Sequence, residues 1–150
     1  MNSKAQIDDF LAQKSLAFVG VSRSPRQFAN SAFREMQKAG YRLFPVHPEM
    51  DTFEGIPCHR RLVDLPEPVG GVVAMVASER AEEVVLEAAA AHIRRIWFQQ
   101  QGSSDAALRA CASLGIAAVH DECLLMFVPG NAVFHRLHRG IRGLFGRLPR

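Results

Sequence analysis

The sequence has little cysteine and no apolar run long enough to cross a membrane. Its three cysteines, Cys58, Cys111 and Cys123, form no CxxC pair and leave an odd count, which argues against a disulfide framework. The longest apolar stretches have the length of strands, whereas a spanning helix needs about 20 residues. Residues 1–10 also lack the basic and apolar segments of a secretory signal. We therefore expect a cytoplasmic protein with no membrane partner.

Acidic residues are missing from the last part of the chain. From Pro129 onward the sequence has five arginines and neither aspartate nor glutamate, so the net charge of +3 comes from this segment. Positions 1–128 contain 13 basic and 15 acidic residues, a balance of −2. A nucleic-acid-binding domain carries a general basic field, which this part of the chain lacks. We expect no nucleic-acid partner.

Apolar segments typical of buried strands alternate with helical patterns over residues 1–128. The helical patterns run from Phe28 to a stop at Gly40, from Ser78 to Ala89, and from a cap at Ser103 to a stop at Gly115. This alternation predicts one α/β domain, an open, doubly wound, parallel five-stranded sheet of the Rossmann type in three α/β/α layers. The expected strands are residues 16–21, 41–46, 72–76, 95–98 and 116–119.

Residues 129–150 are predicted to form a separate, basic amphipathic helix. At 100° per residue its apolar side chains share one stripe, and its arginines and histidines lie off that stripe. Gly140, Gly143 and Gly146 weaken it as an isolated helix, which favours packing on the domain or on a second subunit. A homodimer through this helix is therefore one possibility, and a basic helix on an anionic membrane is the alternative. The stripe consists of Val133, Phe134, Leu137, Ile141, Leu144, Phe145 and Leu148.

The expected ligand site lies beyond the carboxyl ends of the strands, where ligands bind in open α/β sheets. After the first strand a glycine leads through serines and arginines to a helix N-terminus, where free N–H groups favour a phosphate. The three further strand tips complete the site. The candidate residues are Gly20, Val21, Ser22, Arg23, Ser24, Arg26 and Ser31 at the first tip; Val46, His47 and Pro48 at the second; Val76, Ala77 and Ser78 at the third; and Gln99, Gln100 and Gly102 at the fourth.

The sequence lacks the usual nucleotide fingerprints. Residues 20–25 have no second and third glycine of a GxGxxG motif, and no GxxxxGK[ST] loop occurs. No carboxylate directly follows the second strand to hold an adenosine 2′-hydroxyl, because Glu49 comes only after His47 and Pro48. NAD and P-loop nucleotides are therefore disfavoured.

Five short segments in order resemble the stand-alone CoA-binding domain family, which is related to the N-terminal domain of the succinyl-CoA synthetase α subunit. The resemblance covers residues 14 to about 128 and implies coenzyme A or an acyl-CoA as the cofactor. It also implies the diphosphate at Gly20 and Ser22, adenosine at 46–48, and pantetheine between 76–78 and Gln99. His47 stands where the family usually has asparagine. The segments are 18–22 (FVGVS), 40–48 (GYRLFPVHP), 62–69 (LVDLPEPV), 96–99 (IWFQ) and 120–123 (HDEC).

No catalytic constellation stands out in the sequence. His120, Asp121 and Glu122 precede Cys123, which makes this cysteine a possible redox residue, although a thiolate beside two acids is electrostatically disfavoured. No metal site is expected. We expect non-catalytic binding of CoA or acyl-CoA. The alternatives are an NAD- or nucleotide-dependent enzyme using the same cleft, and an interaction module with a vestigial cleft.

Overall fold

The computed structural model describes residues 2–24 and 27–128. The predicted C-terminal helix, with its possible role in a dimer, lies outside these residues, as does Arg26. The helices are α1 (Lys4–Ala12), α2 (Phe28–Lys38), α3 (Ala81–Ala90) and α4 (Asp105–Leu114), with 3-10 turns η1 (Leu62–Asp64), η2 (Ser78–Arg80), η3 (Gln100–Gly102) and η4 (Leu124–Met126). The strands are β1 (Ser15–Val19), β2 (Arg42–Val46), β3 (Thr52–Phe53), β4 (Ile56–Pro57), β5 (Gly71–Ala74), β6 (Arg95–Gln99) and β7 (Ala117–Glu122).

Five parallel strands form the main sheet in the order β2-β1-β5-β6-β7. The predicted α/β fold with a parallel five-stranded sheet is confirmed. The chain runs from β1 outward to β2 and then returns to β5 on the other side of β1. The strand order therefore reverses between β1 and β5, and this point is where a doubly wound sheet binds its ligand.

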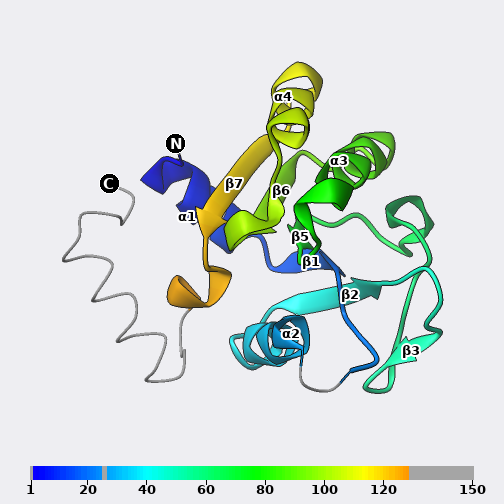
Figure 1. Cartoon of the computed structure of the whole chain (residues 1–150). Coiled ribbons are helices and arrows are strands. Elements are labelled where there is room, and N and C mark those ends of the chain that lie inside the picture. Colours follow the sequence, from blue (N-terminus) through cyan, green and yellow to red (C-terminus); the bar gives the residue numbers. More distant parts are fainter. Residues whose placement is uncertain (1, 25–26, 129–150) are drawn as a thin grey trace.

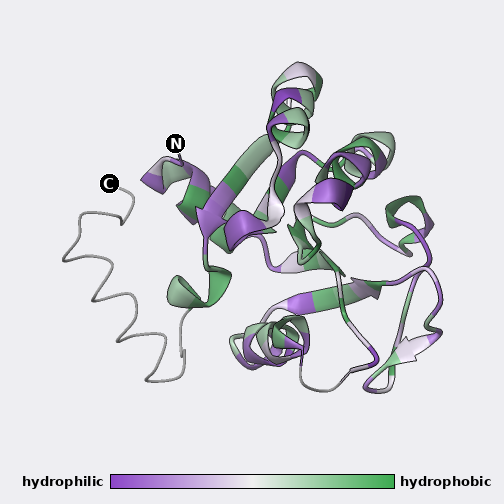
Figure 2. Cartoon of the chain, in the orientation of Figure 1, coloured by the Kyte–Doolittle hydropathy of each residue, from purple (hydrophilic) through white to green (hydrophobic). Residues whose placement is uncertain are grey.

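Helices cover both faces of the sheet (Figure 1). On one face α1, α2 and η4 bury Phe10, Phe33 and Leu124 against β1, β5 and β6. On the other face α3 and α4 bury Val85 and Cys111 against the same strands. The inner strands consist largely of apolar residues (Figure 2), because each face meets a helix layer. This double burial explains why the strands are continuous apolar runs in the sequence.

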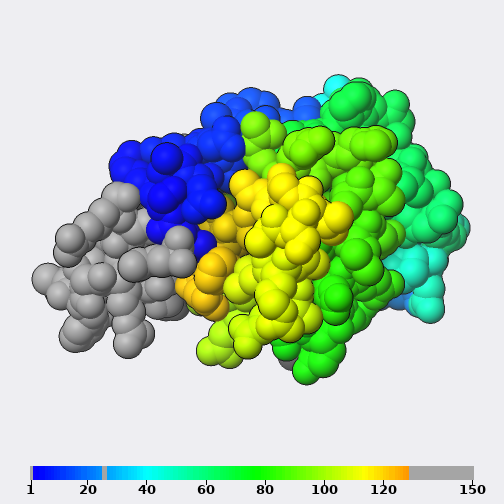
Figure 3. Space-filling view, turned by 90° about the horizontal axis from the view of Figure 1, so that it is seen from above, coloured from blue at the N-terminus to red at the C-terminus, as the bar shows by residue number. Residues whose placement is uncertain are grey.

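Helix α1 was not predicted from the sequence. Ser3 caps it in a capping box with Gln6, and only Ile7 and Phe10 of the helix are buried. Before it, the Asn2 side chain pairs with the edge strand β7: its Oδ1 accepts the His120 N–H at 2.9 Å and its Nδ2 donates to the His120 carbonyl. Figure 3 shows the N-terminal segment lying against the segment around β7. The amide thus satisfies backbone groups that an edge strand leaves open.

Several boundaries differ from the prediction, and the first and third strands end two residues earlier than expected, at Val19 and Ala74. Ser104 rather than Ser103 caps α4, with its side chain accepting the Ala107 N–H at 3.1 Å. A 3-10 turn, η2, occupies Ser78–Arg80, so α3 begins at Ala81. Strand β7 extends to Glu122, so His120 and Asp121 lie within a strand rather than beyond its tip. Among the described residues, no helix has the length and apolar character needed to cross a membrane.

Gly20 allows β1 and β5 to approach each other at the point where the strand order reverses. Its φ is +120°, and a Cβ added there would lie 2.2 Å from the Met75 carbonyl oxygen. Next to it, the Met75 N–H donates to the Val19 carbonyl at 2.8 Å. A side chain at this position would have to separate the two strand tips.

Replacing Gly20 with alanine should destabilise the protein more than replacing Gly40. Both glycines have positive φ, but a Cβ at Gly40 meets nothing within 4 Å. We expect Gly40→Ala to lower the free energy of unfolding by about 1–3 kcal/mol through backbone strain alone. Gly20→Ala should add roughly 1–3 kcal/mol for the steric overlap. Urea unfolding of both variants measures the difference, and equal losses would show that the Met75 contact relaxes without cost.

Candidate functional site

The loop after β1 lies at the reversal point and reaches toward the N-terminus of α2. Gly20 is half-buried, whereas Arg23 and Ser24 are exposed. Gln27, the N-cap residue of α2, makes no side-chain cap hydrogen bond, and the first turn of the helix has no acidic residue. An N-terminus without an acid or a side-chain cap retains its preference for an anion. The loop predicted to bind a phosphate thus precedes a helix N-terminus that could accept an anion.

The buried Asn30 holds this loop through its side-chain amide. Its Oδ1 accepts the Ser22 N–H at 2.9 Å, and its Nδ2 donates to the carbonyls of Ser22 at 2.8 Å and Ser24 at 3.0 Å. Asn30 is only 1% exposed, which marks it as a structural part of the site. The sequence analysis missed Asn30 and selected its neighbour Ser31, which is exposed on α2.

Ser22 closes the loop from the other side. Its Oγ accepts the Ser24 N–H at 3.1 Å, which forms a local turn. A hydroxyl that accepts one hydrogen bond still has its own proton to donate. The Ser22 hydroxyl can therefore donate to a ligand while it shapes the loop.

At the β2 tip, the His47 ring acts as an acceptor for the backbone that follows it. Its Nδ1 accepts the N–H groups of Glu49 and Met50, each at 3.0 Å. This arrangement requires an unprotonated Nδ1. Burial lowers the pKa of His47, and Arg23, Arg60 and Arg80 lower it further, while Glu49 opposes them. Both the geometry and the charges favour the neutral ring.

The remaining predicted residues line the tips of β5 and β6. Val76 and Ser78 are half-buried, and Ala77 and Gln100 are exposed. Gly102 is buried against this tip, because an added Cβ would lie 2.9 Å from the Val76 carbonyl oxygen. These two tips therefore lie side by side, as predicted.

Gln99 has a structural role that was not foreseen. Its Oε1 accepts the Leu124 N–H at 2.9 Å, and this bond holds η4 against the end of β6. Its Nε2 is buried, with no hydrogen-bond partner among the described residues. The amide is thus turned into the protein rather than toward a ligand beside the strand tips.

A hollow of about 370 Å³ adjoins the loop on the α2 side of the sheet. Ser22, Arg23 and Asn30 form one wall, while Met50 and Phe53 belong to the segment after β2. Across it, Arg34 Nε and Glu54 Oε1 form an ion pair at 2.6 Å. The hollow runs from the first predicted tip to residues 50–54 and gives a ligand on the loop room to extend, and residues 46–48 of the second predicted tip do not line it.

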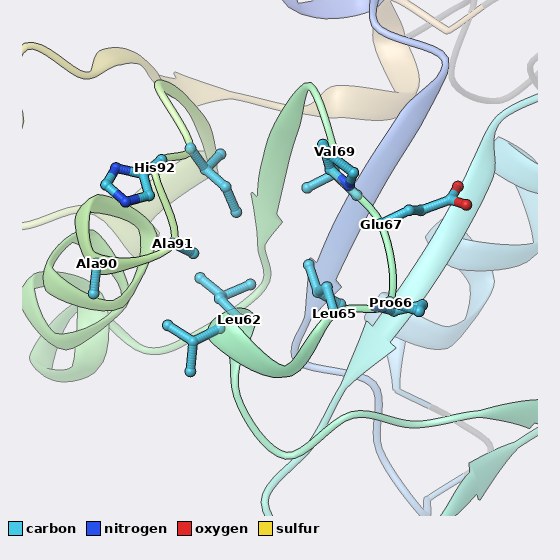
Figure 4. A pocket seen from close by; sticks show the side chains of 11 residues that line it. Leu62, Leu65, Pro66, Glu67, Val69, Ala90, Ala91 and His92 are labelled. Carbon is cyan, nitrogen blue, oxygen red and sulfur yellow. The ribbon is translucent and has the colours of Figure 1, made fainter.

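A second hollow, of about 510 Å³, lies at the opposite edge of the sheet. Figure 4 shows its walls, in which Leu62, Leu65 and Val69 face the end of α3 at Ala91 and His92. Val69 precedes β5, so this hollow is at the amino ends of the strands. It is separate from the predicted site.

The candidate redox residue Cys123 is buried, with 3% of its surface exposed. His120 Nδ1 lies 2.7 Å from an Asp121 carboxylate oxygen, and this pair belongs to the edge strand. All three cysteines are free thiols, and burial raises the pKa of Cys111 to about 11. No group of three His, Cys, Asp or Glu residues suited to a metal ion occurs within 2–24 and 27–128.

Comparison with known proteins gives a consistent result. The model of a family described as "CoA binding domain" matches residues 14–129. The uncharacterized protein YneT of Bacillus subtilis (strain 168) is 28% identical over 123 residues, which cover 81% of this chain and 91% of that protein. A hypothetical protein from Pyrococcus horikoshii OT3 has a similar structure, with a TM-score of 0.77, 25% identity, and coverage of 82% of this chain and 87% of that chain.

A larger enzyme contains the same fold. The dinucleotide-forming acetyl-coenzyme A synthetase 1 of Ca. Korarchaeum cryptofilum matches 75% of this chain with a TM-score of 0.65 and 20% identity. The match covers 27% of the synthetase chain, so this protein corresponds to one part of it.

Removing the Asn30 amide should loosen the loop and lower stability. Asn30→Ala leaves the Ser22 N–H and two carbonyls without their partner, and we expect a loss of about 1–3 kcal/mol in the free energy of unfolding. Asn30→Asp keeps the acceptor but sets a carboxylate against the carbonyls of Ser22 and Ser24. The loss in the free energy of unfolding of this variant, relative to the wild type, should therefore become smaller at acidic pH, where the carboxyl is protonated. Ser31→Ala is the matched control, and urea unfolding should find it neutral; an equally destabilised control would argue against a specific role of Asn30.

The His47 contacts predict a pH dependence of stability. Because the pKa of His47 in the folded protein lies below the ordinary histidine value of about 6.5, the unfolded chain takes up this proton first as the pH falls. The stabilisation is complete above about pH 6.5 and is lost as the pH falls through the folded pKa. His47→Asn retains an acceptor for the two N–H groups but does not titrate. Urea unfolding at several pH values should show a shallower decline for this variant between pH 7 and 5, and identical slopes would contradict the assignment.

Proposed function

The chain belongs to the CoA-binding domain family, and from this we propose that it binds coenzyme A or an acyl-CoA without transforming it. The site fits such a ligand in the chemistry of its donors. Ser22 offers a hydroxyl proton, Arg23 a positive charge, and α2 an N-terminus without an acid. Such groups favour the binding of a diphosphate.

The observation that carries the proposal is the loop held by Asn30. Three hydrogen bonds of one buried amide fix residues 22–24 in front of α2. A loop with this much internal bonding needs little ordering when a ligand arrives, and preorganisation of this kind favours binding. The hollow of about 370 Å³ beside it has room for part of a nucleotide.

Several observations support binding rather than catalysis. Cys123 is buried at 3% exposure, and burial raises the pKa of Cys111 and of Cys58, which suppresses the reactive thiolate form. His47 uses Nδ1 on the backbone, so this nitrogen cannot serve as a general base. The synthetase that shares the fold handles acetyl-CoA by name, and a chain corresponding to one part of it can retain the binding step alone.

Ligand-induced stabilisation tests the proposal. At 100 times its dissociation constant, CoA should add roughly 2.7 kcal/mol to the free energy of unfolding. For a chain of 150 residues this corresponds to a rise in Tm of about 5–10 °C. NAD and ATP at equal concentration should give smaller shifts. A larger shift with NAD would favour a dinucleotide-dependent enzyme, and no shift with any of these ligands would favour an interaction module.

Incubation with acetyl-CoA tests the absence of catalysis. Release of the free CoA thiol should proceed at the rate measured in buffer alone. A protein-dependent release that saturates with acetyl-CoA would overturn the non-catalytic part of the proposal and leave the binding part intact.

A further inference from the structure

The described chain ends on the face of the sheet that carries α2. Strand β7 leads into η4, whose three residues are at most 2% exposed, and Val128 after it is 3% exposed. The ring centroid of Phe127 lies 5.8 Å from that of Trp97, which belongs to the core on this face. Residue 129 is bonded to Val128, so the segment of residues 129–150 starts directly beside η4.

Apolar side chains remain partly exposed here and at the start of α2. Because α2 follows β1 and η4 follows β7, the start of α2 and η4 are both at the carboxyl ends of parallel strands, and α2 contacts η4 (Figure 1). Phe28, the first residue of α2, is 41% exposed, although phenylalanine is usually buried. Ala29 and Phe127 are half-buried and pack against the same core. We call Phe28, Ala29 and Phe127 the exit patch.

The charges of the two parts of the chain are complementary. Strand β7 ends in Asp121, whose side chain is 66% exposed, and Glu122, and it leads directly into η4. Residues 129–150 contain five arginines and no acid, whereas residues 1–128 have 13 basic and 15 acidic residues, a balance of −2. The field of the domain therefore attracts the segment, in addition to any apolar contact that the segment makes.

The segment has the length and the sequence to turn back onto the exit patch. Residues 129–131 read Pro-Gly-Asn, which is typical of a turn, and asparagine also caps helix N-termini. The apolar stripe that follows, from Val133 to Leu148, corresponds to a helix of about 24 Å. Only residues 129–132 separate Val128 from this stripe, so the effective concentration of the stripe at the patch is high. The patch of the same subunit is therefore favoured over that of a second subunit.

We infer that residues 129–150 form an amphipathic helix that docks on the exit patch of their own subunit. Because the stripe contains three glycines, this helix needs tertiary packing to form, and the patch offers it an apolar surface. The docked helix also acts on the ligand loop. Phe28 lies in the first turn of α2, and from the same turn Asn30 holds residues 22–24. Docking therefore stabilises this turn and the loop, whatever ligand the loop binds.

Hydrogen exchange of the full chain, followed by NMR, tests the inference. Leu137→Gln places a polar group in the stripe, and His138→Gln, at the next position but off the stripe, is the matched control. In Leu137→Gln the N–H groups of Asn30 and Phe127 should exchange about tenfold faster or more, because the burial of a leucine side chain changes an equilibrium constant by at least about this factor. The N–H of Ile93, which bonds to Ala88 at the end of α3, should keep its rate. His138→Gln should leave all three rates unchanged.

Protein concentration decides whether the patch belongs to the same subunit. The difference in exchange between the wild type and Leu137→Gln should be the same at every concentration, and light scattering should give both proteins the same mass. A difference that disappears on dilution, together with a smaller mass for Leu137→Gln, would show that the segment docks on a second copy, and the inference would be wrong.

Two further results would overturn the inference. Equal exchange at Asn30 and Phe127 in the wild type and in Leu137→Gln would show that the segment does not dock on the patch, and sedimentation of the wild type with phosphatidylglycerol vesicles would then identify an anionic membrane as its partner. Exchange of residues 137–145 in the wild type at the rate of an unfolded peptide would show that the segment is not a docked helix. This second measurement needs no variant, so it decides the matter should Leu137→Gln fail to fold.

The inference does not depend on the proposed function. If the protein binds no CoA, the proposed function fails, and the exchange rates still decide whether the segment docks. If the exchange rates show no docking, CoA binding is unaffected as a proposal.

Discussion

The close approach of β1 and β5 is the constraint on which the site depends. The two strands are far apart in the sequence, and the chain builds α2, β2 and the short hairpin of β3 and β4 between them. They must nevertheless pair along their length and part only after Val19 and Ala74. Gly20 makes this possible, because its backbone turns away at φ +120° directly over the Met75 carbonyl. Everything that follows β1, including the loop and the start of α2, takes its position from this turn.

The loop beyond Gly20 needs a second support, since it has no place in the sheet. Asn30 supplies that support from within the first turn of α2. Its amide both accepts and donates hydrogen bonds to the loop. The oxygen accepts from one N–H, and the NH2 group donates to two carbonyls. Because the amide is buried, water does not compete for these bonds. The helix thus fixes the loop that its own N-terminus faces.

The sequence predicts the sheet well because its strands are buried on both faces. Leu16 to Phe18 and Val72 to Ala74 are completely buried, and such segments form unbroken apolar runs. Helix α1 escaped notice because only Ile7 and Phe10 of it are buried, too few for a clear periodicity. The roles of Asn30 and Gln99 could not be predicted, since each bonds to backbone groups that only the folded chain brings near. The orientation of the His47 ring is likewise a property of the loop around it.

The strand tips share a pattern in how they use their polar groups. The acceptors are engaged within the protein: Asn30 holds the carbonyls of Ser22 and Ser24, Arg60 holds that of Pro48, and His47 Nδ1 receives two backbone N–H groups. The groups left for a ligand are donors, namely the Ser22 hydroxyl proton and the second ring nitrogen of His47. A surface that satisfies its acceptors internally and keeps its donors outward offers hydrogen bonds to an anion and withholds them from a hydroxyl donor.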